Sequence, residues 1–142
     1  MNATAERGVH GAAGEGTVQK FAELAARILL SALFLIAGLN KIGQYAAMTG
    51  YMESAGVPGQ LLPFVIALEI GGALALIVGW KTRIVASLMA GFTVVTAVVF
   101  HGNLSDPEQF IHFLKNVSIA GGFLVLIVNG AGPLSLDRRT QS

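Results

Sequence analysis

The sequence predicts an all-α fold in which four transmembrane helices form one bundle, and three observations predict it. Hydrophobic residues make up 54% of the 142 residues and charged residues only 12%, about half the ~25% of soluble domains. Four apolar stretches follow one another, each near the ~20 residues that a helix needs to cross a bilayer. These stretches also lack the polar face of a helix in a soluble bundle.

Each apolar stretch predicts one span. In chain order we expect spans at about 21–41, 60–80, 84–101 and 109–129. The first is preceded by acidic residues and followed by no small-residue cleavage site, which argues against a cleaved signal peptide. Residues 1–18 are rich in glycine and alanine without periodicity, so we expect a disordered cytoplasmic tail there. The membrane domain would then cover 19–137, with a second short tail at 138–142.

A short amphipathic segment is predicted between the first two spans. Tyr45, Met48, Met52 and Ala55 recur at helical spacing, which predicts a helix lying in the membrane interface. Gly56 and the glycine and proline that follow would end it. Such a helix serves either as a plain connector or as a lid over the bundle.

Basic residues gather at one end of the predicted bundle and orient it. They are Arg7, Lys20, Lys81, Arg83, Arg138 and Arg139. The loops at the other end hold few basic residues, so the positive-inside bias places both termini in the cytoplasm. The net charge of +1 gives no field that would attract nucleic acid, and we expect the lipid bilayer as the chief partner.

An internal echo suggests that the bundle is built from two hairpins in a parallel pseudo-repeat. The segments 71–78 and 121–128 differ only at their third and fifth positions. We expect small residues in the second and fourth spans to serve helix packing, since they let helix backbones approach closely in lipid. The candidates for this packing role are Ala67, Gly71, Gly72, Ser118, Gly121 and Gly122.

Polar residues inside the spans are the candidate binding site, because ionisable groups in a bilayer are costly and seldom face lipid. The candidates are Lys41, Glu69, His112, Lys115 and Asn116. Superposing the two echoed segments puts Lys115 about one helical turn from Glu69, so we expect these two to pair, with Lys41 as a third member. The pair has three readings: a structural ion pair, a site for a polar head group such as a quinone or an anion, or a proton relay.

Other chemistry finds little support in the sequence. His101 and His112 lack a fixed ligand spacing, so we expect no metal site, and the absence of cysteine excludes thiol chemistry by this chain. No catalytic residue can be assigned. Arg27 is expected to extend to the lipid head groups or to pair with Glu23 one turn before it.

The residues of the spans resemble the DoxX family of small bacterial membrane proteins over about 22–137. The similarity rests on polar and glycine positions in each half of the chain: Arg27, Phe34, Gly38 and Lys41; Glu69, Gly72, Gly79 and Arg83; Phe113-Leu-Lys-Asn116; Gly121-Gly122; and Gly130-Ala-Gly-Pro-Leu-Ser-Leu-Asp137.

The resemblance implies a four-helix subunit of the bacterial inner membrane linked to redox complexes. Members of the family include a subunit of a thiosulfate:quinone oxidoreductase and partners of superoxide dismutase and sulfurtransferase. We therefore expect a quinone-interacting subunit with no covalently bound cofactor. The alternatives are a non-catalytic anchor for other membrane redox subunits or for a soluble redox enzyme, and a small-molecule permease or lipid-handling protein.

Overall fold

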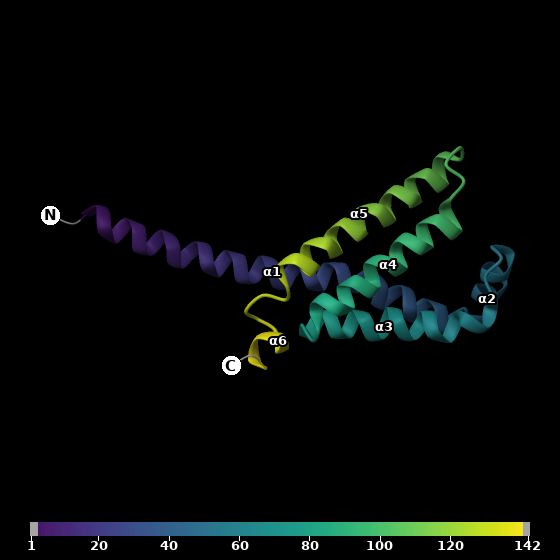
Figure 1. The fold of residues 1–142 in the computed structure, drawn as a ribbon, viewed down its shortest axis with the longest axis horizontal. Coiled ribbons are helices and arrows are strands. Elements are labelled where there is room, and N and C mark those ends of the chain that lie inside the picture. The colour runs from purple at the N-terminus through teal and green to yellow at the C-terminus, as the bar shows by residue number, and fades with distance from the viewer. Residues whose placement is uncertain (1–2, 141–142) are drawn as a thin grey trace.

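The computed structural model describes the backbone of residues 3–140 and the side chains of residues 16–140. Over this part of the chain the fold is all-helical, as predicted (Figure 1). The elements are α1 (Ala3–Gly43), α2 (Tyr45–Ser54), the 3-10 turn η1 (Gly59–Leu61), α3 (Leu62–Val78), α4 (Thr82–His101), α5 (Pro107–Asn129) and α6 (Leu136–Arg139).

Four helical segments are long and apolar enough to cross a membrane. They are Gly16–Gly43, Gly59–Val78, Thr82–His101 and Pro107–Asn129. Large apolar side chains point outward from them; Phe64 and Val128, for example, are each 72% exposed. Such a surface needs lipid around it, because water would solvate it poorly. The chain is therefore an integral membrane protein, and the short helix α2 lies between its first two spans as expected.

The start of α1 differs from the sequence-based expectation. The sequence predicts an irregular tail over 1–18, whereas the described backbone is helical from Ala3 onward. This segment contains four alanines, the residue with the highest helix propensity, but also four glycines, which disfavour a helix, so propensity alone does not account for the difference. Figure 1 shows that this half of α1 extends beyond the other helices. The ends of the two predicted tails, residues 1–2 and 141–142, lie outside the described residues.

The spans pair as two hairpins, α1 with α3 and α4 with α5, and glycines join the hairpins to each other. A Cβ atom on Gly72 of α3 would meet Met89 Sδ of α4 at 2.6 Å. A Cβ atom on Gly122 of α5 would meet Leu30 Cδ2 of α1 at 3.0 Å. The second helix of each hairpin thus packs through an echoed glycine on the first helix of the other.

The other small residues proposed for packing face outward. A Cβ atom on Gly71 or on Gly121 would meet nothing within 4 Å, and Ala67 and Ser118 are exposed. Within this chain the packing role therefore belongs to Gly72 and Gly122. The spacing in the sequence could not separate the two faces, since neighbouring glycines in a helix point about 100° apart.

The core lies where the two hairpins cross. Phe34 and Phe123 meet there with ring centroids 5.5 Å apart, beside Leu76 and Met89, which are fully buried. The two ends of the bundle differ. We call them the α2 end, where α2 lies beside the ends of α1 and α3, and the α6 end, where the α3–α4 turn meets the C-terminal segment (Figure 1).

Arg27 holds the α6 end together, in contrast to the expectation that it reaches the head groups. Its side chain is 0% exposed. It donates hydrogen bonds to the carbonyl oxygens of Leu76 (3.2 Å) and Ile77 (3.1 Å) and to that of Leu134. The last carbonyls of a helix lack partners within the helix, so a buried guanidinium satisfies those at the end of α3.

Asp137 completes the same junction from the C-terminal segment. Its carboxylate accepts hydrogen bonds from the main-chain N–H groups of Lys81 (2.6 Å) and Thr82 (2.8 Å), where α4 begins. Its own N–H donates to the carbonyl of Gly79 at 2.8 Å. Gly79 ends α3 with φ +72°, a conformation that favours glycine. The Gly130–Asp137 motif therefore stabilises the α3–α4 turn through the hydrogen bonds of Asp137.

Candidate functional site

A cavity of about 500 Å³ lies between the two hairpins at the α2 end. We call it the α2-end cavity. All four spans and α2 contribute to its wall, and most of the wall is apolar. The residues that line it are Lys41, Met48, Tyr51, Met52, Val57, Leu61, Val65, Glu69, Phe92, Val95, Thr96, Val99, Phe100, His101 and His112. Its volume falls within the ~300–1,000 Å³ typical of small-molecule sites.

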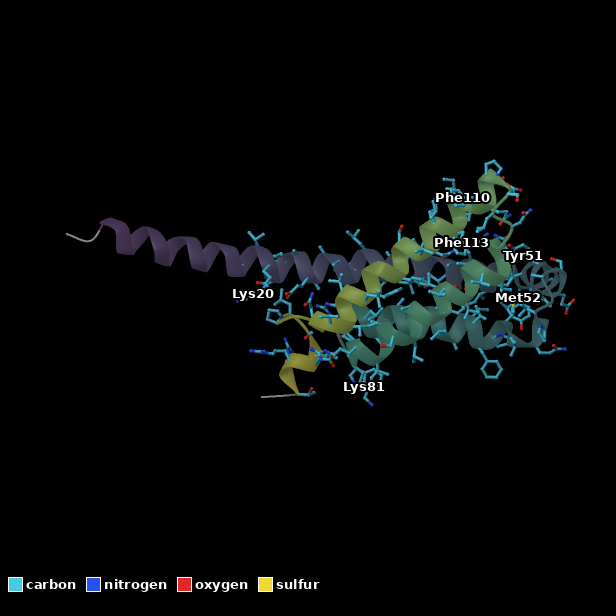
Figure 2. All side chains as sticks on the ribbon, turned by 45° about the horizontal axis from the view of Figure 1, so that its top comes forward. Lys20, Tyr51, Met52, Lys81, Phe110 and Phe113 are labelled. Carbon is cyan, nitrogen blue, oxygen red and sulfur yellow. The ribbon has the colours of Figure 1, made fainter. Side chains whose placement is uncertain are left out.

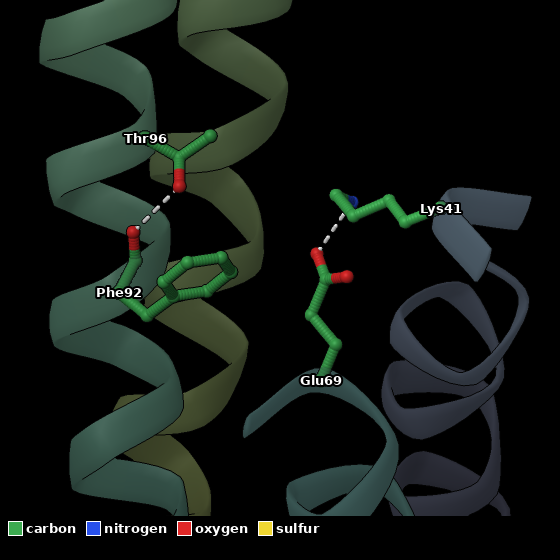
Figure 3. A network of polar contacts seen from close by, with 4 residues as sticks. All are labelled: Lys41, Glu69, Phe92 and Thr96. Carbon is green, nitrogen blue, oxygen red and sulfur yellow. Dashed lines mark hydrogen bonds and ion pairs between the residues drawn. The ribbon is translucent and has the colours of Figure 1, made fainter. Parts of the chain in front are cut away.

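An ion pair between Lys41 and Glu69 forms the polar wall of this cavity. Lys41 Nζ lies 2.8 Å from Glu69 Oε1, and the whole Glu69 residue is only 4% exposed. Figure 3 shows Lys41 at the end of α1 and Glu69 on α3 facing each other, with Phe92 and Thr96 of α4 across from them. The hydroxyl of Thr96 donates to the carbonyl of Phe92 at 2.8 Å.

The second carboxylate oxygen of Glu69 is the unusual feature of the site. Glu69 Oε2 is buried, and among the described residues it has no hydrogen-bond partner. A buried polar atom without a partner is costly, about 1–3 kcal/mol and more when it is charged. Glu69 thus holds, within the wall of the cavity, an acceptor oxygen with one hydrogen bond unmade, beside an ammonium that has further N–H donors.

Helix α2 contributes Met48, Tyr51 and Met52 to the wall of the cavity. Met52 is buried, and the ring of Tyr51 stacks on Phe100 of α4 with a centroid distance of 5.3 Å. Figure 2 shows Tyr51 and Met52 side by side at this end of the molecule. Gly56, with φ +77°, follows α2 and allows the chain to turn back into α3.

Two histidines stand at the edge of the cavity, one from each helix of the second hairpin. The rings of His101 and His112 stack with centroids 5.0 Å apart, and His101 Nδ1 lies 2.8 Å from Gln109 Oε1. Within the described residues no group of three or more histidine, cysteine, aspartate or glutamate side chains is placed to hold a metal ion. The two rings instead supply nitrogen atoms that can donate hydrogen bonds to a ligand or accept them from it.

The structure brings together only part of the predicted site. Lys41, Glu69 and His112 line the α2-end cavity, but Lys115 is exposed on another face of α5, beside Ile111 and Ser118. The expected Glu69–Lys115 pair is therefore not formed, and Lys41 takes the place of Lys115. The Asn116 side chain donates to the carbonyl of His112 at 3.1 Å, one turn back along its own helix.

Comparison with known proteins places this arrangement in a family. The DoxX family model matches residues 22–102, which include most of the first span, α2 and the second and third spans. The chain is 50% identical over 115 residues to the inner membrane protein YqjF of Escherichia coli (strain K12), covering 81% of this chain and 88% of YqjF. The chain belongs to the DoxX family.

A second relative from the same bacterium agrees. The inner membrane protein YphA of Escherichia coli (strain K12) is 40% identical over 124 residues, which cover 82% of this chain and 88% of YphA. Subunit a of the ATP synthase of Rhizobium meliloti (strain 1021) is 30% identical over 122 residues but is matched over only 46% of its length. No solved structure matches this DoxX protein.

The cavity contains residues that the sequence did not single out. Phe92, Val95 and Thr96 on α4 resemble any apolar or weakly polar stretch of a span. Their role follows from the crossing of the two hairpins, which hydropathy does not encode. The candidate site of this DoxX protein therefore joins two charged residues that the sequence singles out, Lys41 and Glu69, to a wall that only the packing reveals.

Proposed function

We propose that this DoxX protein binds a lipid-soluble molecule with a polar head group in the α2-end cavity, and that the ligand is of the quinone class. The unmade hydrogen bond at Glu69 Oε2, in the wall of a chiefly apolar cavity, carries the proposal. A quinol hydroxyl would donate to this oxygen. A quinone carbonyl would accept from Lys41 or from a histidine at the cavity edge.

The chemistry of the wall supports both parts of such a ligand. Phe92, Val95 and Val99 offer an apolar surface to a ring and its substituents. A permease for polar solutes would need a more polar passage, and an anchor would need no cavity at all. Because quinones carry electrons within the bilayer, a membrane redox complex is the setting that we propose, with partner subunits supplying the electron carriers.

The distribution of charge supports an orientation. Lys81, Arg83 and Arg139 are exposed at the α6 end, whereas Lys41 at the α2 end is partly buried and paired. By the positive-inside bias, we propose that the α6 end and both termini lie in the cytoplasm. The names of YqjF and YphA support the bacterial inner membrane as the location. Since the chain lacks cysteine, single cysteines placed at Ser54 and Thr140 would report the orientation by impermeant maleimide labelling.

Native mass spectrometry of the detergent-purified protein with added decylubiquinone or decylubiquinol would test the proposed ligand. Val95 lines the cavity and its neighbour Val94 does not, although both are exposed. We expect Val95→Trp to abolish binding of either form and Val94→Trp to leave it unchanged. Glu69→Gln should weaken decylubiquinol binding by about tenfold, the effect of losing one hydrogen bond to a charged group.

Two results would contradict the proposal. One is the absence of a bound state for both forms at concentrations that saturate the micelles. The other is equal binding of the ligand to the Val94→Trp and Val95→Trp variants, since this would mean that the ligand partitions around the protein rather than into the cavity.

A further inference from the structure

A second candidate site lies at the opposite end of the molecule, on the membrane-facing side of α1 and α5. A groove of about 470 Å³ runs between these two helices, and we call it the α1–α5 groove. Its lining residues are all apolar: Ala26, Leu29, Leu30, Leu33, Ile119, Gly122, Val125 and Leu126. Both walls belong to membrane spans, so hydrocarbon is the medium that fills the groove.

A larger and polar cavity adjoins the groove at the α6 end. It has a volume of about 800 Å³ and is lined by Glu23 of α1, by the 129–133 loop, by the start of α4 and by the C-terminal segment. Basic side chains gather here: Lys81, Arg83 and Arg138. Figure 2 shows Lys81 at this end of the molecule, on the turn between α3 and α4. We call this space the α6-end cavity.

The two spaces follow each other along the same pair of helices. On α1, Glu23 lines the α6-end cavity and Ala26 lines the groove. On α5, Asn129 lines the cavity and Leu126 lines the groove. Three residues of helix correspond to a rise of about 4.5 Å. A molecule with a charged head and an apolar tail could therefore occupy both.

The charges of the α6-end cavity favour a negatively charged head group. Of its two acidic residues, Asp137 accepts from two main-chain N–H groups, and Glu23 accepts through Oε1 from Gln19 Nε2 at 2.9 Å, while Glu23 Oε2 is buried without a partner among the described residues. Three basic side chains against these two acids leave the cavity with a net positive charge. The Arg83 guanidinium lies beside Gly130, where its Nε would be 3.4 Å from an added Cβ atom. Arginine presents several N–H donors in a fixed plane, which suits the oxygens of a phosphate.

We propose that the α6-end cavity and the α1–α5 groove together bind one anionic phospholipid. Its phosphate lies against Arg83 and Lys81, and one acyl chain fills the groove. Trp80, half exposed beside Lys81, marks the level of the membrane interface, where tryptophan is favoured. This site is separate from the α2-end cavity and does not depend on the ligand proposed there.

The test is native mass spectrometry of the full chain after delipidation and re-addition of single lipids in detergent. The probes are dioleoyl phosphatidylglycerol, phosphatidylethanolamine and phosphatidylcholine. We expect one phosphatidylglycerol to stay bound at a tenfold lower concentration than either of the other two. Arg83→Gln and Lys81→Gln should each weaken phosphatidylglycerol binding by about fivefold. Arg139→Gln removes an equal charge outside the cavity and should change nothing.

A second pair of variants tests the groove. Ala26 lines it, whereas Ala25 is exposed on the neighbouring face of α1. Ala26→Phe should lower binding of phosphatidylglycerol by at least tenfold, and Ala25→Phe should not. Val95→Trp, which fills the α2-end cavity, should also leave lipid binding unchanged, so failure of either proposed site is recognised separately.

Several outcomes would overturn the proposal. Equal retention of all three lipids, or an equal effect of Arg83→Gln and Arg139→Gln, would show that lipid surrounds the protein without a site. Displacement of phosphatidylglycerol by millimolar inorganic phosphate would mean that the head cavity binds a free anion. A change of protein mass from dimer to monomer in Ala26→Phe would show that a second copy of the chain covers the groove.

Discussion

The buried guanidinium of Arg27 donates a hydrogen bond to the main-chain carbonyl of Leu134, which joins the first span to the last loop of the chain. The same group binds the carbonyls of Leu76 and Ile77 at the end of α3. One side chain thus connects three segments that are far apart in the sequence. Hydrogen bonds of this kind are strong in a low-dielectric interior, and their loss would remove the donor that Arg27 supplies to the carbonyls of Ile77 and Leu134.

We expect Arg27→Gln to lower the stability of the protein by about 1.5–3 kcal/mol, the range for hydrogen bonds to a charged group. The stability of Arg27→Lys should lie between those of Arg27→Gln and the parent protein, since an ammonium donates hydrogen bonds but lacks the planar fork of N–H donors. Thermal unfolding in a mild detergent measures both. Arg139→Gln is the control, because Arg139 is exposed. Equal unfolding temperatures for Arg27→Gln and the parent protein would contradict the structural role of Arg27.

Asp137 makes the stability of the α6 end depend on pH. Burial by itself raises the pKa of Asp137, but hydrogen bonds from Thr82 and Lys81 and the charge of Arg27 outweigh it and hold the pKa below its ordinary value of 3.8. A carboxylate with a lowered pKa stabilises the fold fully above its unfolded pKa, and this contribution is lost as the pH falls through the folded pKa.

We therefore expect Asp137→Asn to be less stable than the parent protein by about 1 kcal/mol at pH 7, the difference between a charged and a neutral acceptor. The gap should stay constant down to pH 5 and close below about pH 4. Chemical unfolding at a series of pH values measures it. A gap that is as wide at pH 3 as at pH 7 would mean that the charge of Asp137 does not stabilise the junction.

The sequence predicts the fold well because membrane insertion depends on local hydropathy. The four spans and the short helix α2 can be predicted from windows of about 20 residues. The pairing of Glu69 is harder to predict. The echo between the second and fourth spans places Lys115 at a suitable depth but does not tell which way it points around its helix axis. Lys115 lies on an outer face, and Lys41 makes the ion pair.

The burial of Arg27 could not be predicted for a related reason. An arginine near the end of a span normally reaches the interface, and nothing in its own helix shows that the carbonyls of α3 and of the last loop meet there. The α2-end cavity follows from the crossing of two hairpins and is likewise absent from any single span. Local patterns thus predict the elements, and the site depends on how the elements cross.

The echoed glycines allow a matched test of helix packing. Gly72→Ala adds a methyl group against Met89, whereas Gly71→Ala adds one where no atom lies within 4 Å. We expect the first to cost about 1–3 kcal/mol through overpacking and the second to stabilise the protein by up to about 1 kcal/mol, because alanine has the higher helix propensity. Unfolding in detergent distinguishes them. The reverse order would mean that Gly71 packs against a partner outside this chain.

The ion pair at the α2-end cavity can be separated into its two charges by a double-mutant cycle. Lys41→Met leaves the Glu69 carboxylate buried without its ammonium partner, and removing one member of a buried pair typically costs about 3–5 kcal/mol. Adding Glu69→Leu to Lys41→Met removes the remaining charge and fills the space with apolar atoms. We therefore expect the double variant to unfold at a higher temperature than Lys41→Met alone.

The same cycle separates stability from ligand binding. If the pair is retained for a ligand, the double variant should regain stability but fail to bind decylubiquinol, because the acceptor at Glu69 Oε2 is gone. If the pair only fixes the register of α1 and α3, both Lys41→Met and the double variant should be less stable than the parent protein. Each variant should then lose decylubiquinol binding only to the extent that it is destabilised. A double variant that is stable and still binds decylubiquinol as tightly as the parent would exclude Glu69 as the group that holds the head of the ligand.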